Sequence, residues 1–468
     1  MKNIYAILIV LAALYIDANS QVVPSIKSAT LINDDKAVID QHLSKYNAFT
    51  IDKDELTDKL YSNKGAGEFR LRINEELDWT ISLEFNDMRA PGYKRTVVLD
   101  KGVVEDEFKL NTFKGKTSDG KIVRLTIDEN NFFGVIIDNK EHYVIRPTND
   151  ITKNSKDKSF IVYKNSDIII SDYINDVLLD PIDHKNGLML QDIMNDSNKS
   201  ASSSPCALHY LKMAIDADYE FYQKVGSNSN SYIFSTLNIV EGVIEPTFGL
   251  KFMITYQNVW TTTSGAYPYT TGGDMLYSLA VQYWWTISQA QVSRNHIHLF
   301  TGKPYGGAAH QGQLDDPNNP APYSYAVAVS GYDGPITYSV VAHELGHSLG
   351  AGHIPPQFVN ACMCSDPNNL SIMCGTSTMQ QPLWYCDHSI NEISTVLNNN
   401  LHKLECVPSL PCISNFSNQT VTNNTTINGC STLTVQNVTV TNNAKLTINS
   451  GGVVTFSDFN LVSGQLET

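Results

Sequence analysis

The segment HELGHSLGAGH, residues 343–353, decides the fold of this 468-residue chain, because it carries three histidines at offsets of four and six residues. Histidines four residues apart on a helix project from the same side, one turn apart. Apolar side chains around them would give such a helix a buried face: Val340, Val341, Leu345 and Leu349. Gly350 follows, and a glycine with positive φ can end a helix and turn the chain. We expect that turn to bring His353 back toward the other two histidines.

These residue types indicate a metal site. An imidazole nitrogen binds Zn²⁺ at about 2.0–2.1 Å, and three protein ligands leave the fourth position to water, as in catalytic zinc sites. The sequence therefore predicts that His343, His347 and His353 hold zinc. Zinc lowers the pKa of a bound water to about 7, so the neighbouring Glu344 can accept its proton and return it to the leaving amine of a peptide.

The same segment matches HExxHxxGxxH, the motif of the metzincin metallopeptidases, and the chain is most similar to their adamalysin or reprolysin group. SIMCG (371–375) resembles the Met-turn of that family and places its methionine, Met373, beneath the metal. The resemblance implies an α/β (α+β) catalytic domain with a mixed sheet and an active-site helix. It covers roughly residues 80 to 406. Within it, 112–147 is similar to the propeptides of the group, with Phe113-x-Gly115 and VRLTID.

The chain departs from the adamalysin pattern at two points. Ile354 stands where that group has aspartate after the third histidine, which leaves the subgroup open but not the metal. Many relatives are kept latent by a propeptide cysteine bound to zinc, and residues 21–205 contain no cysteine. We therefore expect another ligand, such as a propeptide carboxylate, or steric cover alone, to keep this chain latent. No calcium site is expected.

The N-terminus predicts export. One lysine, an apolar run at 4–16 and the small residues Ala18 and Ser20 are typical of a secretory signal peptide, so we expect a secreted, soluble product. Composition then changes at a serine-rich stretch, 195–205, that suits a cleavable linker. We expect four parts: a signal peptide (1–20), a β-rich propeptide (21–204), a zinc metalloprotease catalytic domain (205–409) and a small β-rich, Asn/Thr-rich tail (410–468).

Local patterns predict several elements. In the propeptide, strands are expected near 121–127, 132–138 and 142–146. In the catalytic domain we expect helices at 217–226 and 231–245, a strand at 250–260, and a helix within 387–406 opened by a capping box of Ser389 and Glu392. From position in the family, 306–314 is the expected substrate edge and 375–384 the expected pocket wall. We interpret His310 in that edge as an ordinary polar residue.

All eight cysteines lie in the second half of the chain. An even count in an exported protein indicates disulfides. The resemblance implies pairs Cys362–Cys386 and Cys364–Cys374 in the lower subdomain, and we further expect Cys206–Cys406 and Cys412–Cys430. The tail alternates Val, Leu and Ile with Asn, Thr and Ser, which favours a small β-solenoid or β-sandwich, with a disordered polar tail as the alternative. We expect such a tail to bind a surface or a glycan.

The net charge and hydropathy of the chain exclude some classes of function. A formal net charge of −15 argues against nucleic acid as a partner, and no stretch after the signal is long and apolar enough for a transmembrane helix. The prediction is a secreted zinc endopeptidase that acts on proteins or peptides and is made as a zymogen. Two alternatives stay open: a catalytically inert binding or adhesion protein, and a zinc hydrolase with a substrate other than peptides.

Overall fold

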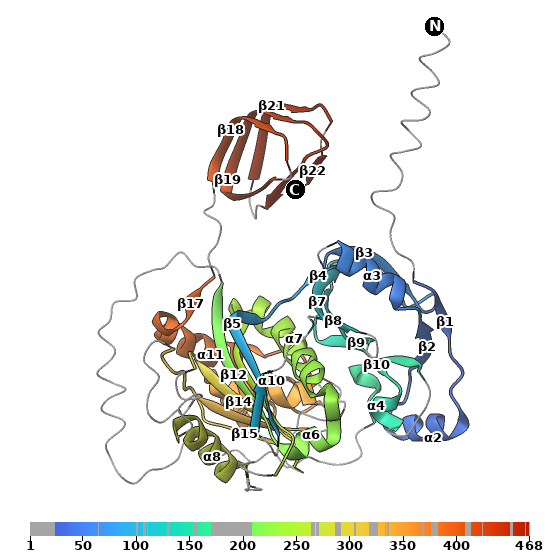
Figure 1. Cartoon of the computed structure of the whole chain (residues 1–468), viewed down its shortest axis with the longest axis vertical. Helices are drawn as coiled ribbons and strands as arrows, with labels where there is room; N and C mark the ends of the chain where they lie inside the picture. The colour runs from blue at the N-terminus through green and yellow to red at the C-terminus, as the bar shows by residue number, and fades with distance from the viewer. Residues whose placement is uncertain are drawn as a thin grey trace. The chain divides into compact units, whose positions relative to one another are not determined.

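The computed structural model describes residues 24–169, 208–407 and 413–467, with short gaps at 64, 100–101, 106–108, 110, 129–131, 153–157, 264–266, 268–270, 286–291, 304–305, 318–325, 333, 335–336, 367–368, 376–381, 424, 450–452 and 464. The expected signal peptide and the serine-rich linker lie outside these residues. The chain divides into two compact units, Met1–Ser202 with Tyr210–Glu405, and Ser203–His209 with Cys406–Thr468. Figure 1 labels the elements of both.

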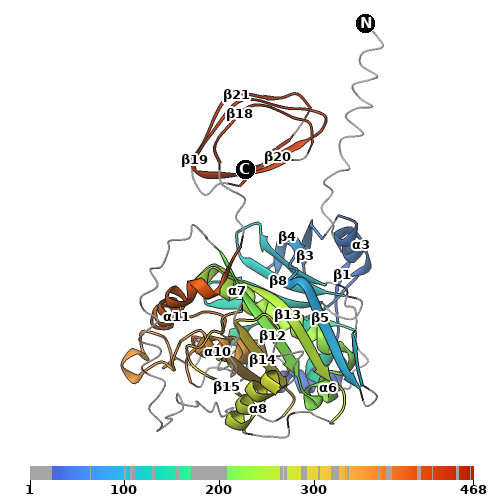
Figure 2. The same cartoon turned by 60° about the vertical axis from the view of Figure 1, so that its left-hand side comes forward.

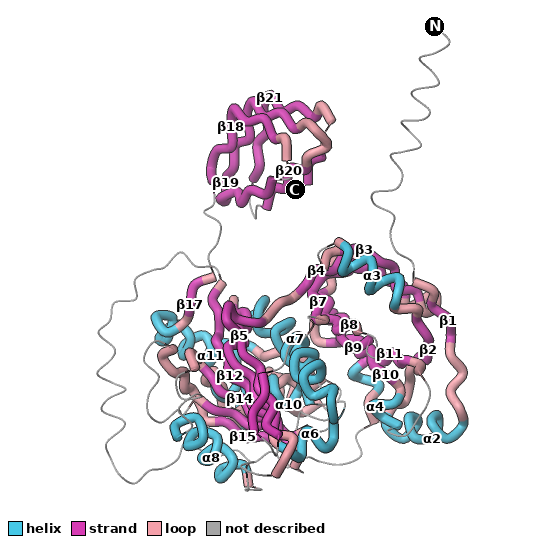
Figure 3. The backbone as a smooth tube through the Cα atoms, viewed as in Figure 1, coloured by secondary structure: helices cyan, strands magenta, loops and turns pink. Residues whose placement is uncertain are grey.

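The N-terminal region of the first unit, residues 24–169, is built mainly of strands (Figure 3). One nine-stranded sheet runs in the order β1 (Ile26–Ser28), β2 (Asn47–Ile51), β11 (Phe160–Lys164), β10 (Glu141–Pro147), β9 (Phe132–Asp138), β8 (Ile122–Ile127), β7 (Thr112–Thr117), β4 (Asp78–Phe85) and β3 (Gly67–Arg72). Its helices are α2 (Asn33–His42), α3 (Asp54–Ser62) and α4 (Asn149–Thr152). Strands β8, β9 and β10 coincide with the three predicted strands to within a residue at nearly every end.

A second sheet of eight strands forms the centre of the first unit. Its order is β15 (Gly307–Ala309), β16 (Val327–Gly331), β14 (His296–Thr301), β12 (His209–Ala217), β13 (Leu250–Trp260), β5 (Arg89–Leu99) and β6 (Gly102–Glu105), with β17 (Glu405–Cys406) beside β12. β12, β14 and β16 run parallel, and β15 runs antiparallel to β16. The predicted mixed sheet is therefore present, and β5 and β6 of the N-terminal region belong to it.

Four helices pack against this sheet: α6 (Tyr219–Val225), α7 (Ser229–Phe248), α8 (Gly272–Trp285) and α10 (Thr337–Ser348). A further helix, α11 (Asp387–Asn400), contacts α7. α6, α7 and β13 lie where the sequence predicts them. The predicted capping box is wrong, because α11 begins at Asp387 with Cys386 as its N-cap, so Ser389 is buried inside the first turn. No helix among the described residues is long and apolar enough to cross a membrane.

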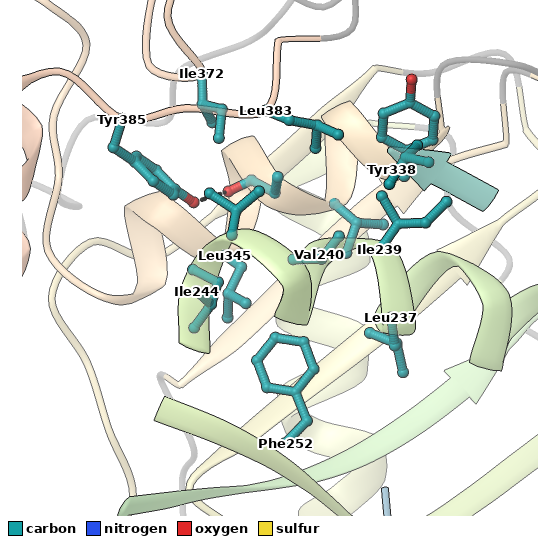
Figure 4. Packing of buried hydrophobic residues seen from close by; sticks show 14 of the residues in the cluster. Leu237, Ile239, Val240, Ile244, Phe252, Tyr338, Leu345, Ile372, Leu383 and Tyr385 are labelled. Atoms are coloured by element: carbon teal, nitrogen blue, oxygen red, sulfur yellow. Dashed lines mark hydrogen bonds between the residues drawn. The ribbon is translucent and has the colours of Figure 1, made fainter. Parts of the chain in front are cut away.

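One apolar core links α7, α10 and the second sheet. Figure 4 shows Val240 and Ile244 of α7 near Leu345 of α10, and Phe252 on the opposite side of α7. α7 carries buried residues on every face, from Ile233 to Ile244, because it has the second sheet on one side and strands β7 to β9 on another. A helix that is buried all round requires such two-sided cover.

Two disulfides brace the segment that follows the third histidine. Cys362 is bonded to Cys386 and Cys364 to Cys374, with Cα–Cα distances of 5.4 and 5.5 Å. These are the two pairs that the family resemblance implies, and the structure confirms them. Cys406 is also disulfide-bonded, while Cys206 and Cys412, which belong to the other two predicted pairs, lie outside the described residues.

The second unit consists of strands that repeat in parallel register: β18 (Ile413–Val421), β19 (Thr425–Val440), β20 (Lys445–Asn449), β21 (Val453–Leu461) and β22 (Gln465–Glu467). Figure 2 looks along these coils. Asn418, Asn437 and Asp458 have positive φ and follow the same register, so the chain bends at equivalent positions of successive coils. The Asn437 amide donates to Asn418 Oδ1 at 2.8 Å, forming a short asparagine ladder.

Candidate metal centre

The three predicted histidines converge in the structure. His343 and His347 lie one turn apart on α10, and His353 lies on the loop after it. His343 Nε2 is 3.0 Å from His347 Nε2 and 3.2 Å from His353 Nε2. Three nitrogens that each bind one tetrahedral zinc at about 2.0–2.1 Å lie about 3.3 Å apart. The spacing in the protein is close to that value.

The hydrogen-bond partners of two of these rings favour a metal ion at the point where the nitrogens converge. His343 Nδ1 lies 2.6 Å from the carbonyl oxygen of Ile372, and His347 Nδ1 lies 2.7 Å from that of Ala351. A carbonyl only accepts, so each neutral imidazole holds its proton on Nδ1 and presents a lone pair at Nε2. Lone pairs that face each other at 3.0 Å repel. A metal ion between them would convert this repulsion into coordination, and the carbonyls hold the rings in the orientation that it would need.

Glu344 lies on the same helix and is almost fully buried, with 2% of its surface exposed. Its position is set by Gly307 on β15, the edge strand of the second sheet. A Cβ on Gly307 would lie 2.1 Å from Glu344 Oε1, 2.4 Å from Cδ and 2.5 Å from Cγ. Only glycine leaves room for this carboxylate, which is thereby held between the helix and the strand expected to bind substrate.

Met373 is fully buried beneath the helix. A Cβ on Gly346, which lies between the two helical histidines, would meet Met373 Sδ at 2.5 Å. The backbone amide of Ile354 donates to the Met373 carbonyl at 3.2 Å, and Tyr385 OH donates to the carbonyl of Ala342 at 2.6 Å, as Figure 4 shows. The turn that carries Met373 therefore supports the floor of the site at several points.

The end of α10 is joined to the expected substrate edge. Carbonyl groups in the last turn of a helix have no partner within the helix. Here Gly312 N donates to the His347 carbonyl at 3.0 Å, Gln313 N to that of Ser348 at 3.1 Å, and Gln311 Nε2 to that of Gly350 at 3.0 Å. Residues 311–313 thus cap the helix that carries two of the histidines.

Gly350 makes the predicted turn, with φ of +121°. An alanine there would be strained, and its Cβ would lie 2.4 Å from Val396 Cγ2 on α11. We expect Gly350→Ala to destabilise the fold by about 1–3 kcal/mol and to weaken zinc binding, because the turn places His353. Denaturant unfolding and zinc titration measure the two effects. An unchanged unfolding midpoint would contradict this role. Adding Val396→Ala to the Gly350→Ala chain removes the overlap of the new methyl group with Val396, so any loss of stability that remains comes from backbone strain.

Sequence reasoning found the histidines, Glu344, Gly350 and Met373, and the structure brings all of them together. It missed Gly307, Gly346, Tyr385 and the Ile372 carbonyl. Glycines at 306 and 307 within the expected edge are the only sequence signal for the first of these, and nothing marks the others. His310, interpreted as an ordinary polar residue, follows β15 and does not belong to the group of histidines that converges.

A comparison with protein families agrees with this geometry. Residues 209–385 match the model of metallopeptidase family M12, of the reprolysin type. The match begins at β12 and ends at Tyr385, so it contains the whole histidine cluster, Glu344 and the Met373 turn. Over these residues, which hold the histidine cluster, the chain is similar to reprolysin-type metallopeptidases of family M12.

Proposed function

We propose that the protein is a secreted zinc endopeptidase that cleaves proteins and is made as a zymogen, with residues 21–204 as its propeptide. One observation carries the zinc assignment: three imidazole nitrogens converge at 3.0–3.2 Å with the protons of two rings directed away from the centre. Such a donor set fits Zn²⁺, which accepts neutral imidazoles in tetrahedral geometry. His343, His347 and His353 would hold the ion.

When bound, zinc supplies a Lewis acid that activates a water near neutral pH and polarises a carbonyl oxygen. Glu344 performs the proton transfers: it accepts a proton from the attacking water and delivers it to the leaving nitrogen of the peptide. β15 is an edge strand, so an extended substrate can add to it through backbone hydrogen bonds. This places a scissile peptide beside Glu344, which contacts β15 at Gly307.

The rival function is an inert domain of the same fold that only binds a partner. The packing around Glu344 argues against an inert domain. Residue 307 of β15 is a glycine, and any larger side chain there would overlap the buried carboxylate of Glu344. A domain that only binds a partner has no need of the space that Gly307 leaves for this carboxylate.

Metal removal tests the proposal. We expect the secreted, linker-cleaved protein to hydrolyse casein, to lose that activity in excess 1,10-phenanthroline, and to recover it when stoichiometric zinc is returned. Magnesium and a serine-protease inhibitor serve as controls and should change nothing. Hydrolysis that persists in the chelator, with no zinc detectable in the protein, would exclude a zinc peptidase and favour the inert alternative with a contaminating protease.

A further inference from the structure

We propose that residues 24–169 are not released when the linker is cut but remain bound as a subunit of the active enzyme. Activity of the two-chain form rests on the proposed function, whereas association of the two chains does not depend on it. Residues 21–205 contain no cysteine, so the association is non-covalent. Three features of the first unit carry the inference.

The first feature is strand addition. β5 pairs in parallel with β13 and extends the second sheet, and β6 pairs with β5 in turn. Backbone bonds join them, from Ile254 N to the Met88 carbonyl at 2.6 Å and from Thr261 N to the Val98 carbonyl at 3.0 Å. Side chains add to these: the Thr96 hydroxyl donates to Asn258 Oδ1 at 2.7 Å. Without β5, one edge of the sheet would expose its backbone groups, a known hazard for aggregation.

A polar face on α7 is the second feature. Asn238, Glu241, Gly242 and Glu245 lie three, four and seven residues apart and so share one side of the helix. Asn86 Nδ2 donates to Glu241 Oε1 at 2.7 Å and Asn238 Nδ2 to the Phe113 carbonyl at 3.1 Å. Asn238 and Glu241 are fully buried. Removing the N-terminal region would take these partners away, which is unfavourable for buried polar groups.

Arg124 of β8 joins the same face. Its guanidinium lies 2.7 Å from Glu245 and 3.9 Å from Glu241, and only 4% of the residue is exposed. Gly242 lets the arginine approach, because a Cβ on Gly242 would lie 2.7 Å from Arg124 Cγ, and its three nearest atoms all belong to Arg124. The helix of the catalytic domain is therefore shaped to fit this one side chain of the N-terminal region.

A shared apolar core is the third feature. The cluster that contains Leu345 of the active-site helix also contains Ile39, Met88, Val135 and Val144 of the N-terminal region, all at most 1% exposed. His142 of β10 lies 3.3 Å from Tyr338 OH on α10, and Lys140 Nζ lies 4.3 Å from the Trp384 ring in the expected pocket wall. Separation would expose this core to water, so the hydrophobic effect opposes it.

The position of the added strands is compatible with catalysis. β5 and β6 lie at one edge of the second sheet, and β15, beside Glu344, lies at the opposite edge. Figure 2 shows β5 alongside β13. A retained N-terminal region can therefore support the sheet, α7 and α10 while the edge expected to bind substrate is formed by other strands.

The experiment uses the full chain with a site for a sequence-specific protease placed within 195–205. After cutting, we expect both chains to co-elute on size exclusion at micromolar concentration in 1 M NaCl, and the complex to cleave casein. Separation of the wild-type chains on the column would overturn the proposal, as would a separated C-terminal chain that is more active than the complex. Co-elution of a complex that cleaves nothing would support retention and count against the peptidase instead.

Two variants make the test specific. Arg124→Ala and Gly242→Ala are each expected to speed dissociation of the cut chains at least tenfold. The first removes the ion pair with Glu245, and the second adds a methyl group that overlaps the side chain of Arg124. Alanine favours helix formation over glycine, so Gly242→Ala leaves α7 itself able to fold. Arg70→Ala is the matched control, since Arg70 pairs with Asp78 inside the N-terminal region, and should leave dissociation unchanged. Equal rates for all three variants would contradict the proposed interface.

Discussion

Replacing Glu344 by glutamine is expected to lower kcat/KM for a peptide substrate by about 10²–10⁴-fold, the range for loss of a general base. Glutamine has the size of glutamate, so it fits the space left by Gly307 and preserves the packing of α10. Its amide cannot accept the proton of the attacking water, and so only the chemical step is lost. Steady-state kinetics with a fluorogenic peptide measure the change.

Zinc content and thermal midpoint should stay near wild type in Glu344→Gln, because the three histidines are untouched. Glu405→Gln is the control for a change of charge, since Glu405 is half-exposed and pairs with Lys212 at 2.7 Å. It should leave kcat/KM unaltered. A Glu344→Gln enzyme that keeps more than a third of the wild-type rate would mean that another group takes the proton.

Gly307→Ala is expected to lower kcat/KM by about 10²-fold, the loss that a displacement of roughly 1 Å causes at a catalytic group. Three successive atoms of Glu344 lie within 2.5 Å of the position that the new Cβ would take. The backbone of β15 at Gly307 does not have positive φ, so alanine causes no backbone strain there. Glu344 must swing away from the edge strand, and the general base is then misplaced.

Gly352→Ala is the matched control, although it stands next to the ligand His353. Its Cβ would meet only Gln311 Nε2, at 3.4 Å, and Gly352 also lacks positive φ. We therefore expect activity within about threefold of wild type, since surface-type substitutions of this kind change little. If Gly352→Ala were the more damaging of the two, or if Gly307→Ala were silent, the proposed contact between β15 and Glu344 would be wrong.

The convergence of the three histidines could be predicted from the sequence because their geometry is local. A helix sets the relation of His343 to His347, and a glycine turn places His353 three residues after Gly350. Their orientation could not be predicted, since it depends on the carbonyl of Ile372, which is 29 residues from His343. The contact of Gly307 with Glu344 spans a similar distance along the chain and leaves no periodic signal.

Local sequence patterns also predict only part of the architecture. Runs of β-type residues between turn signals located β8, β9 and β10, and an apolar run located β13. No pattern in residues 89–105 indicates that β5 and β6 belong to the sheet of the domain that carries the histidine cluster, where their partner β13 is about 160 residues away in sequence. The predicted capping box at Ser389 is wrong because Glu392 is engaged by a distant part of the chain. The side chain of Glu392 accepts from Gly352 N at 3.0 Å instead, a tertiary contact that local rules do not include.

Metal analysis of the purified chain tests the central claim most directly. After dialysis against zinc and then metal-free buffer, we predict roughly one zinc per chain, with an X-ray absorption edge fitted by nitrogen and oxygen ligands at about 2.0–2.1 Å. His347→Ala removes one ligand and should hold less than about a tenth as much under the same conditions. Wild-type protein without zinc, or a His347→Ala chain that binds as much as wild type, would contradict the three-histidine centre.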